Sequence, residues 1–327
     1  MTLTVAQESF DRLISHWTAP GSGLKWGSIF VLPAWLEVWW RAFLPETELY
    51  LAAVRDGSDI IGIAPLHRKG EEACFVGSPD VCDYQDFIIV PGREVEFYEA
   101  LLDDLARQGI RHLDLSPVRP DSTVMTSLMN VVKNRGGIAV SREDDVTVEM
   151  GLPDSWEEYL EGLDKKQRHE VRRKLRRLWG AGGVNYRCHE VSPADVSGLT
   201  DTFLKLFALS REEKAEFMTP QMEIFFRSMA EAMTEIKRLR YGILEVESRP
   251  AAMTMGFDYD QTMYLYNSAY DPQYNSLSAG LLSKVLCIKE SINQGIKKWD
   301  FLKGAERYKY QLGGGEIKLY NCRITIK

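Results

Sequence analysis

The sequence has little of what metal centres and disulfide scaffolds need. Its five cysteines are scattered, odd in number and without the spacing of metal ligands: Cys74, Cys82, Cys188, Cys287 and Cys322. They indicate reduced thiols in a cytoplasmic protein and no metal site. The five histidines also lack Cys or Ser partners, so neither a catalytic triad nor a zinc site is expected at His16, His67, His112, His169 or His189.

Positive net charge and long apolar runs are also missing. The formal net charge of −7 gives no case for nucleic-acid binding, so no DNA partner is expected. No uncharged run approaches the roughly 20 residues of a membrane helix. Glu8, Asp11 and Arg12 stand where a signal peptide would be apolar. These absences predict a soluble, cytoplasmic protein and leave contact with the inner membrane surface open.

What is present is a duplicated pattern. Gly109–Leu115 parallels Gly295–Phe301, with glycine, isoleucine, a basic residue and aspartate at matching places. Leu49–Leu66 parallels Leu239–Gly256 at nearly the same separation, and both segments resemble a β-hairpin. The order strand, strand, helix, strand in each half indicates an α/β fold of mixed sheets with helices packed on them. We expect two domains, residues 1–150 and 151–327.

The second half contains a motif typical of anion binding. An apolar strand, Met263–Asn267, leads through a turn with Asp271 and Pro272 into small residues. Apolar residues at helical spacing follow in Leu281–Ile292, and a second strand is expected at Lys297–Leu302. This order points backbone N–H groups and a helix N-terminus at an anion, usually a phosphate.

The turn resembles the acyl-CoA-binding signature of the GNAT acetyltransferase superfamily. The matching residues are Asp271, Pro272, Tyr274, Asn275, Ser278 and Gly280. Asn275 stands where Gln or Arg is usual, and Ser278 replaces the first glycine. The resemblance implies acyl-CoA as co-substrate. Its pyrophosphate would be held by the amides of Ser278, Ala279, Gly280 and Leu281, and its pantetheine amides by Asn267 and Tyr270.

A wider set of segments resembles the FemAB-like, CelD/BcsL-type branch. These are Pro33–Leu36, Asp83–Asp86, Arg168–Arg177, Ser278–Gly280 and Asp300–Lys309. The resemblance implies two tandem GNAT-like domains and acyl transfer to an amine or hydroxyl of an envelope glycan, a lipid or a small metabolite. The alternatives are a FemAB-type transferase that uses aminoacyl-tRNA and an accessory protein that binds acyl-CoA or anionic lipid without turnover.

The two halves are not expected to do the same work. The turn of the first half, Ile89–Glu94, lacks a run of small residues, and Glu94 and Glu96 would repel a phosphate. We therefore expect the donor in residues 151–327 and the acceptor in residues 1–150. Asp83, Tyr84 and Asp86 are candidates for binding a cationic or polyhydroxyl acceptor, although Asp83 can equally cap a turn.

Glu306, Tyr308 and Lys309 are the candidate catalytic residues. They follow an expected strand and supply a carboxylate, a phenol and a cation, which acyl transfer can use to accept a proton and stabilise an oxyanion. The resemblance implies that Lys309, after an aromatic residue, assists the transfer, with Glu306 accepting the proton or orienting Lys309. The alternative is a simple surface ion pair at i and i+3.

Lys165–Arg177 is a basic run with Val171, Leu175 and Leu178 at helical spacing, which predicts an amphipathic helix. It is either a solvated face or an anion site, for which Arg168, Arg172 and Arg173 are the best candidates. The absence of heptads disfavours tRNA as donor. The aromatic face of Trp35, Trp39, Trp40 and Phe43 indicates core packing, with a groove for a long acyl chain as the alternative.

Overall fold

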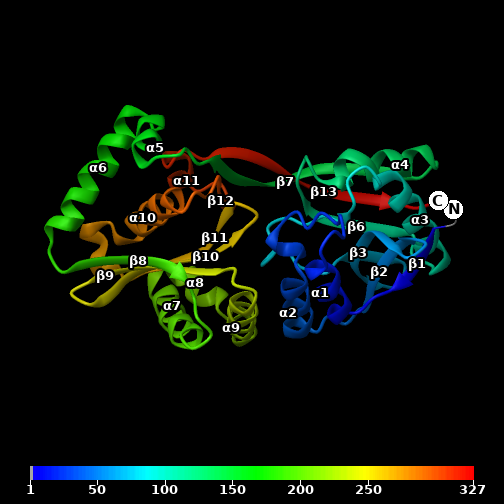
Figure 1. The fold of residues 1–327 in the computed structure, drawn as a ribbon, viewed down its shortest axis with the longest axis horizontal. Helices are drawn as coiled ribbons and strands as arrows, with labels where there is room; N and C mark the ends of the chain where they lie inside the picture. Colours follow the sequence, from blue (N-terminus) through cyan, green and yellow to red (C-terminus); the bar gives the residue numbers. More distant parts are fainter. Residues whose placement is uncertain (1–2) are drawn as a thin grey trace. The chain divides into compact units, whose positions relative to one another are not determined.

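The computed structural model describes residues 3–327 (Figure 1). Contacts divide the chain into two compact units. The first holds the residues up to Val146 together with Ile317–Lys327, and the second holds Thr147–Glu316. Two strands, β7 (Ile138–Gly151) and β13 (Gly315–Thr325), contribute residues to both units.

The first unit is a mixed sheet with helices. In chain order its elements are β1 (Thr4–Gln7), α1 (Phe10–Thr18), η1 (Ile29–Val31), α2 (Pro33–Phe43), β2 (Glu48–Asp56), β3 (Asp59–Lys69), β4 (Glu72–Phe75), β5 (Ile88–Ile89), α3 (Glu94–Arg107), β6 (His112–Val118), η2 (Val124–Leu128) and α4 (Met129–Asn134). The strands lie in the order β1-β2-β3-β4-β6-β13, and β5 pairs with β3.

The second unit has the same kind of sheet. Its elements are α5 (Trp156–Gly162), α6 (Lys165–Gly180), β8 (Val184–Glu190), α7 (Val196–Ser210), α8 (Glu212–Phe217), α9 (Pro220–Glu235), β9 (Leu239–Val246), β10 (Arg249–Tyr259), β11 (Thr262–Tyr270), η3 (Pro272–Leu277), α10 (Ala279–Asn293), β12 (Lys298–Lys303) and α11 (Arg307–Gln311). The strand order is β7-β12-β11-β10-β9-β8, with α10 on one face and α7 and α9 on the other (Figure 1).

The duplication predicted from the sequence extends to the way the strands pair. β2 and β3 form an antiparallel hairpin, as do β9 and β10. In the first unit β4 then pairs in parallel with β6, and α3 lies between them in the chain. In the second unit β11 pairs in parallel with β12, and α10 lies between them in the chain. The mixed α/β architecture and the tandem repeat are therefore confirmed.

The units exchange their last strands. Tyr320–Thr325 of β13 pairs with β6, and Cys322, Ile324 and Ile326 are buried in the core of the first unit. Thr147–Gly151 of β7 pairs with β12 of the second unit. The observed division therefore differs from the expected domains at residues 150/151, because Ile317–Lys327 lies in the first unit. Local sequence pattern holds no signal for such an exchange.

The aromatic face of α2 is packed in the core of its unit. Trp35 and Trp39 are buried, and Trp35 lies edge-to-face against Phe30 with ring centroids 5.0 Å apart. Trp40 and Phe43 are half-buried. Pro33 begins the helix, as its missing N–H and fixed φ allow. Over residues 3–327, no helix combines the length and apolar character that crossing a membrane requires.

Candidate active site in the second unit

A splay between β11 and β12 creates the opening of the candidate site. The two strands pair only where Thr262–Tyr264 meets Lys298–Asp300. Beyond this point β12 bulges, because the buried Asp300 carboxylate accepts from the Leu302 N–H at 2.8 Å and Leu302 adopts a positive φ of 63°. Among residues 3–327, one edge of Leu265–Tyr270 is thereby left without a neighbouring strand.

The turn at the start of α10 has a defined backbone geometry. Asp271 caps η3 by accepting from the Gln273 N–H at 2.9 Å. Ser278 then takes the left-handed conformation, with φ 58° and ψ 35°. That conformation is the one glycine adopts most easily, so this serine performs the backbone task of the glycine in the resembling motif.

Only two of the four expected amides are available to an anion. The Ser278 N–H bonds the Asn275 carbonyl at 2.9 Å, and the Leu281 N–H bonds the Ser278 carbonyl at 3.1 Å. The N–H groups of Ala279 and Gly280 have no acceptor among residues 3–327. They belong to the first turn of α10, where no intrahelical partner exists.

Gly280 is needed for packing against an aromatic ring. A Cβ at this position would lie 2.9 Å from two ring carbons of Tyr270. Tyr270 has its own N–H and C=O engaged, because both bond the Ser210 hydroxyl, at 2.8 and 3.0 Å. Tyr270 therefore holds the turn in place, and its backbone is occupied where pantetheine was expected to bind. Asn267 likewise bonds locally, with its side-chain oxygen 3.3 Å from the Ser268 amide.

The edge of β11 that has no neighbouring strand is covered by residues from the end of α7 and from α8. Asp271 N–H bonds Ala251 of β10, so the alternate residues Ser268 and Tyr270 face the other edge. There Tyr270 bonds Ser210, and the Ser268 carbonyl accepts from the Lys214 ammonium. Two side chains, Ser210 and Lys214, thus occupy these backbone groups of Tyr270 and Ser268.

The basic run forms α6, as predicted, and buries Val171 and Leu178. The arginine that reaches the turn is Arg177, whose guanidinium donates to the Ser278 hydroxyl at 2.8 Å. Arg173 instead pairs with Glu170 at 2.8 Å, and Arg172 is exposed. Arg168 is half-buried, and no contact places it at the turn. Arg177 is thus the arginine of α6 that contacts this turn, and the anion-binding role of Arg168, Arg172 and Arg173 remains a prediction.

Lys309 is buried and fully engaged. Its ammonium donates to the carbonyls of Leu302, Lys303 and Gly304 at 2.9, 2.6 and 3.0 Å. It also pairs with Glu306 at 2.8 Å. The Lys309 side chain is 2% exposed and that of Glu306 is 55% exposed, so the pair joins a buried cation to a carboxylate that reaches solvent. These four acceptors exceed the three protons of an ammonium. Lys309 thus fastens the loop after β12, and its catalytic role remains a prediction.

Sequence reasoning missed a second buried lysine close to Tyr308. Lys284 of α10 donates to the Gly280 carbonyl at 2.7 Å and lies 5.0 Å from the centre of the Tyr308 ring. Burial, then the charges of Lys214 and Arg211, lower the pKa of Lys284 to about 7. Burial also raises the pKa of the Tyr308 phenol, which favours its protonated form. The only signal for Lys284 in the sequence is a lysine amid apolar residues of a helix.

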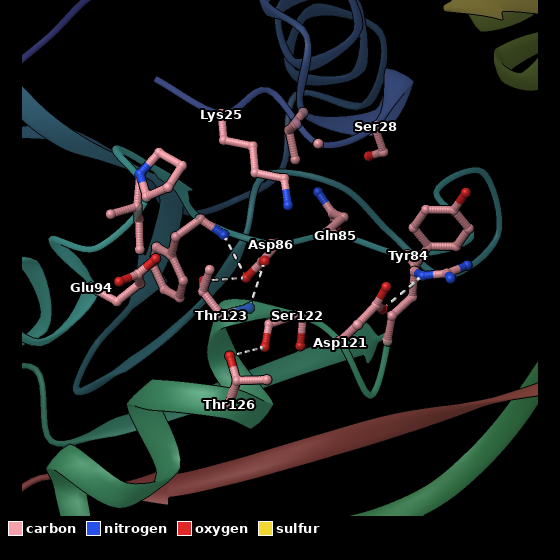
Figure 2. A pocket seen from close by; sticks show the side chains of 16 residues that line it. Lys25, Ser28, Tyr84, Gln85, Asp86, Glu94, Asp121, Ser122, Thr123 and Thr126 are labelled. Carbon is pink, nitrogen blue, oxygen red and sulfur yellow. Dashed lines mark hydrogen bonds and ion pairs between the residues drawn. The ribbon is translucent and has the colours of Figure 1, made fainter. Parts of the chain in front are cut away.

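The first unit contains a separate cavity of about 250 Å³ (Figure 2). Tyr84 and Asp86 line it, together with Lys25, Glu94 and Arg119, and their role in acceptor binding remains a prediction. The Arg119 guanidinium lies 5.0 Å from the centre of the Tyr84 ring. Asp83 is not among the lining residues.

The Asp86 carboxylate is hydrogen-bonded by neighbouring residues. It accepts from the N–H and hydroxyl of Thr123, both at 2.7 Å, and from the Phe87 N–H at 2.9 Å (Figure 2). Thr123 precedes η2, so Asp86 satisfies amides at the start of a helix. Burial raises the pKa of Asp86 to about 6 despite these bonds. The carboxylate therefore positions the cavity wall.

Comparison with known proteins identifies the architecture. Residues 165–310 match the family described as Acetyltransferase (GNAT) domain. FemX is similar over 97% of this chain and 96% of its own, with a TM-score of 0.62 and 12% identity. The chain therefore has the fold of FemX, and its second half matches a GNAT domain.

Two other structures share this fold. A conserved protein of unknown function from Bacteroides thetaiotaomicron matches over 99% of this chain and 100% of its own, with a TM-score of 0.61 and 13% identity. The C-terminal domain of a putative lysylphosphatidylglycerol synthetase from Agrobacterium fabrum matches over 97% and 92%, with a TM-score of 0.58 and 9% identity. At such identities the likeness shows the fold alone. No curated protein matches the sequence.

Within the second GNAT domain, the matched segment includes α6, the splay and the turn of α10. No cluster of three or more potential metal ligands occurs among the residues that the structure describes.

Proposed function

We propose that this protein is an acyltransferase of the CelD/BcsL type, which moves an acyl group from acyl-CoA to an amine or hydroxyl. The observation that carries the proposal is the splay of β11 and β12 beside the N-terminus of α10. The free amides of Ala279 and Gly280 and the nearby Arg177 would hold the donor's diphosphate. The thioester would then lie in the splay, close to Tyr308.

In this proposal, Glu306, Tyr308 and Lys309 remain the residues of the catalytic loop, and the role of Lys309 becomes the positioning of the other two. Lys309 fixes the loop on which Tyr308 and Glu306 stand. Tyr308, with its raised pKa, is suited to giving a proton to the leaving thiolate. The acceptor is an envelope glycan, a lipid or a small metabolite, bound through the first domain beside Tyr84 and Asp86.

The location of the protein is part of the proposal. All five cysteine thiols are unbridged, which supports a reducing, cytoplasmic environment. A glycan or lipid acceptor would bring the protein to the inner membrane surface, and the exposed basic residues of α6 would favour anionic headgroups there.

Donor binding is tested by calorimetric titration with CoA and acetyl-CoA. We expect both to bind, and Arg177→Ala to weaken binding by about tenfold because one charge-assisted contact is lost. Arg173→Ala is the matched control on the same helix, since Arg173 pairs with Glu170 and does not reach the turn. Equal affinities of the two variants would remove Arg177 from the site. Absence of any CoA binding would overturn the donor assignment.

One observation favours a second candidate, a FemAB-type transferase that uses aminoacyl-tRNA. Ser210 and Lys214 occupy the edge of β11 that a pantetheine arm would need, whereas an ester donor without such an arm leaves these contacts intact. Titration with aminoacylated and uncharged tRNA decides between the two. Tight, salt-dependent binding of aminoacyl-tRNA with no CoA binding would favour this candidate. If acyl-CoA binds but no free CoA is released with any acceptor added, the protein is an accessory protein that binds without turnover.

A further inference from the structure

The cavity of the first unit has more negative than positive groups in its wall. Two cations line it, Lys25 and Arg119, against three carboxylates, Asp86, Glu94 and Asp121. Arg119 and Asp121 neutralise each other, because the guanidinium Nε lies 3.0 Å from the Asp121 carboxylate. Lys25 is therefore the remaining cation for two carboxylates, and the wall keeps an excess of one negative charge.

Neither of these two carboxylates is neutralised by a neighbouring cation. Asp86 and Glu94 accept hydrogen bonds from N–H and hydroxyl groups that carry no charge. Arg93, the residue before Glu94, pairs instead with Asp56 and Glu96, at 2.9 and 2.6 Å. Over residues 3–327, no ion pair involves Asp86 or Glu94. Both are half-buried, and carboxylates that lose water without gaining a counter-ion are expected where a cation binds.

Gln85 adds a hydrogen-bond acceptor that has no donor. It lines the cavity and is 3% exposed, and its side-chain Oε1 has no hydrogen-bond partner within residues 3–327. The nitrogen of the same amide donates to the Val76 carbonyl at 2.7 Å, so exchanging oxygen and nitrogen would set two acceptors against each other. A buried acceptor without a donor costs free energy, which an N–H or O–H group of a ligand would recover.

Lys25 does not cancel the negative charge inside the cavity. Its side chain extends toward Gln85 and Asp86 in Figure 2, but it is exposed and forms no ion pair in the part of the chain that the structure describes. Water screens an exposed charge more than a half-buried one. A ligand in the cavity therefore meets an unpaired acceptor and two carboxylates that lack a counter-ion.

We propose that the cavity of the first unit binds a ligand through a protonated amine, to which Glu94 and Gln85 offer acceptors and Asp86 its charge. Since this cavity is the proposed acceptor site, the inference rests on the proposed function and narrows it to an acceptor that bears an amine, such as an amino sugar or an amino alcohol. A neutral polyhydroxyl compound would satisfy the Gln85 oxygen but would leave the two carboxylates without a counter-ion.

The amine bound here is a recognition group. Nearby carboxylates favour its charged form and so raise its pKa. A protonated amine has no lone pair with which to attack a thioester, so the acyl group would go to a hydroxyl or to a second amine of the same molecule. The expected acceptor thus has two functional groups, one that the first unit binds and one that is acylated.

The experiment is isothermal titration calorimetry of the whole protein near neutral pH, without CoA, with three sugars that share one ring. Glucosamine carries a positive charge, glucose no charge and glucose 6-phosphate a negative charge. We expect glucosamine to bind at least about tenfold more tightly than glucose, because a charge-assisted contact is gained. Glucose 6-phosphate should bind most weakly, because the carboxylates repel it.

Variants assign the preference to the cavity wall. Glu94→Gln should lower glucosamine affinity about tenfold and leave glucose affinity within about twofold. Glu96→Gln is the matched control, because Glu96 lies on the same helix, α3, pairs with Arg93 and does not line the cavity. Lys25→Met should strengthen glucosamine binding about twofold, since it removes a like charge. An equal loss in the two Glu variants would reveal a general electrostatic effect and would overturn the site.

The comparison of the three sugars on the unaltered protein decides the inference even if a variant fails to fold. Equal affinities, tighter binding of glucose 6-phosphate, or no binding of any sugar would overturn it. The proposed acyl transfer is judged separately, by the CoA titration. Glucosamine binding without CoA binding would keep the cavity and remove the transfer, whereas CoA binding without a preference for glucosamine would keep the transfer and remove the amine-binding cavity.

Discussion

At the scale of single residues, the two lysines of the candidate site show how partners decide a role. Lys309 and Lys284 both lie close to Tyr308 in the chain or in space, and both are buried. Lys309 has every proton satisfied by the protein, whereas Lys284 does not. A buried ammonium with a complete set of acceptors stabilises the fold, whereas burial lowers the pKa of one with an incomplete set, as at Lys284.

Replacing Lys309 by methionine should therefore destabilise the protein. Three carbonyls around its ammonium would lose their donor, which we expect to cost about 3 kcal/mol or more in the free energy of unfolding. Urea denaturation measures this. The control is Glu306→Gln, whose half-exposed carboxylate should contribute less than about 1 kcal/mol. A Lys309→Met protein with wild-type stability and no turnover would instead favour a direct catalytic role.

The contribution of Asp86 to the free energy of unfolding should depend on pH. Burial raises the pKa of its carboxyl from 3.8 to about 6 in the folded protein. The folded state then holds the proton up to higher pH than the unfolded state does. Its contribution to stability is present at low pH and is lost as the pH rises from about 4 to about 6, by at most about 3 kcal/mol.

The measurement is the free energy of unfolding of the wild type minus that of Asp86→Asn, from urea titrations between about pH 4 and pH 7. Since other carboxyls titrate equally in both proteins, the difference isolates Asp86. We expect this difference to fall as the pH rises. A difference that stays flat, or rises with pH, would mean that the hydrogen bonds from Thr123 and Phe87 outweigh burial.

At the scale of elements, α10 connects the turn at Ser278 to the sheet of the second unit. Its N-terminal residues form the turn, and Cys287 in its middle has its sulfur 3.8 Å from that of Cys188 on β8. The pair lies between a helix and an edge strand. Its two sulfurs are in contact, so oxidation can be tested directly on this pair.

Mild treatment with hydrogen peroxide should convert this pair into a disulfide. Each thiol loses one hydrogen, and the peroxide is reduced to water. Because the bond closes a loop of nearly a hundred residues, we expect the melting temperature to rise by roughly 5–15 °C. Peptide mass spectrometry identifies the bridge. Cys188→Ala should show neither the bridge nor the rise, whereas Cys74→Ala should show both. Oxidation without a rise in Tm would indicate a strained bond.

At the scale of the whole molecule, the features predicted correctly from the sequence are those encoded by local residue patterns. The hairpins, α6 and α10 follow from apolar periodicity and turn residues, and their observed bounds lie close to the expected ones. Ser278 was found because its neighbours resemble a known turn. Arg177, Ser210 and Lys214 were missed, because their partners on the turn and on β11 are distant in sequence. Such contacts are set by packing and leave no periodic signal.

The exchange of β7 and β13 makes the stability of the first unit depend on the end of the chain. Ile324 of β13 is buried, pairs with Leu113 of β6 and belongs to the core of the first unit. Ile324→Asn should therefore cost that unit about 3 kcal/mol, because it places a polar group in an apolar core. The second unit contributes no residue to this core and should be little affected.

Amide hydrogen exchange followed by mass spectrometry reads the two units separately. We expect faster exchange in peptides of β2, β3 and α3 of the Ile324→Asn protein, and unchanged exchange in peptides of β9, β10 and α10. The matched variant is Leu312→Asn, since Leu312 is equally buried but belongs to the core of the second unit. Its effect should fall on the opposite set of peptides. Equal acceleration in both sets by either variant would show that the units unfold together, and that the strand exchange couples them into one cooperative structure.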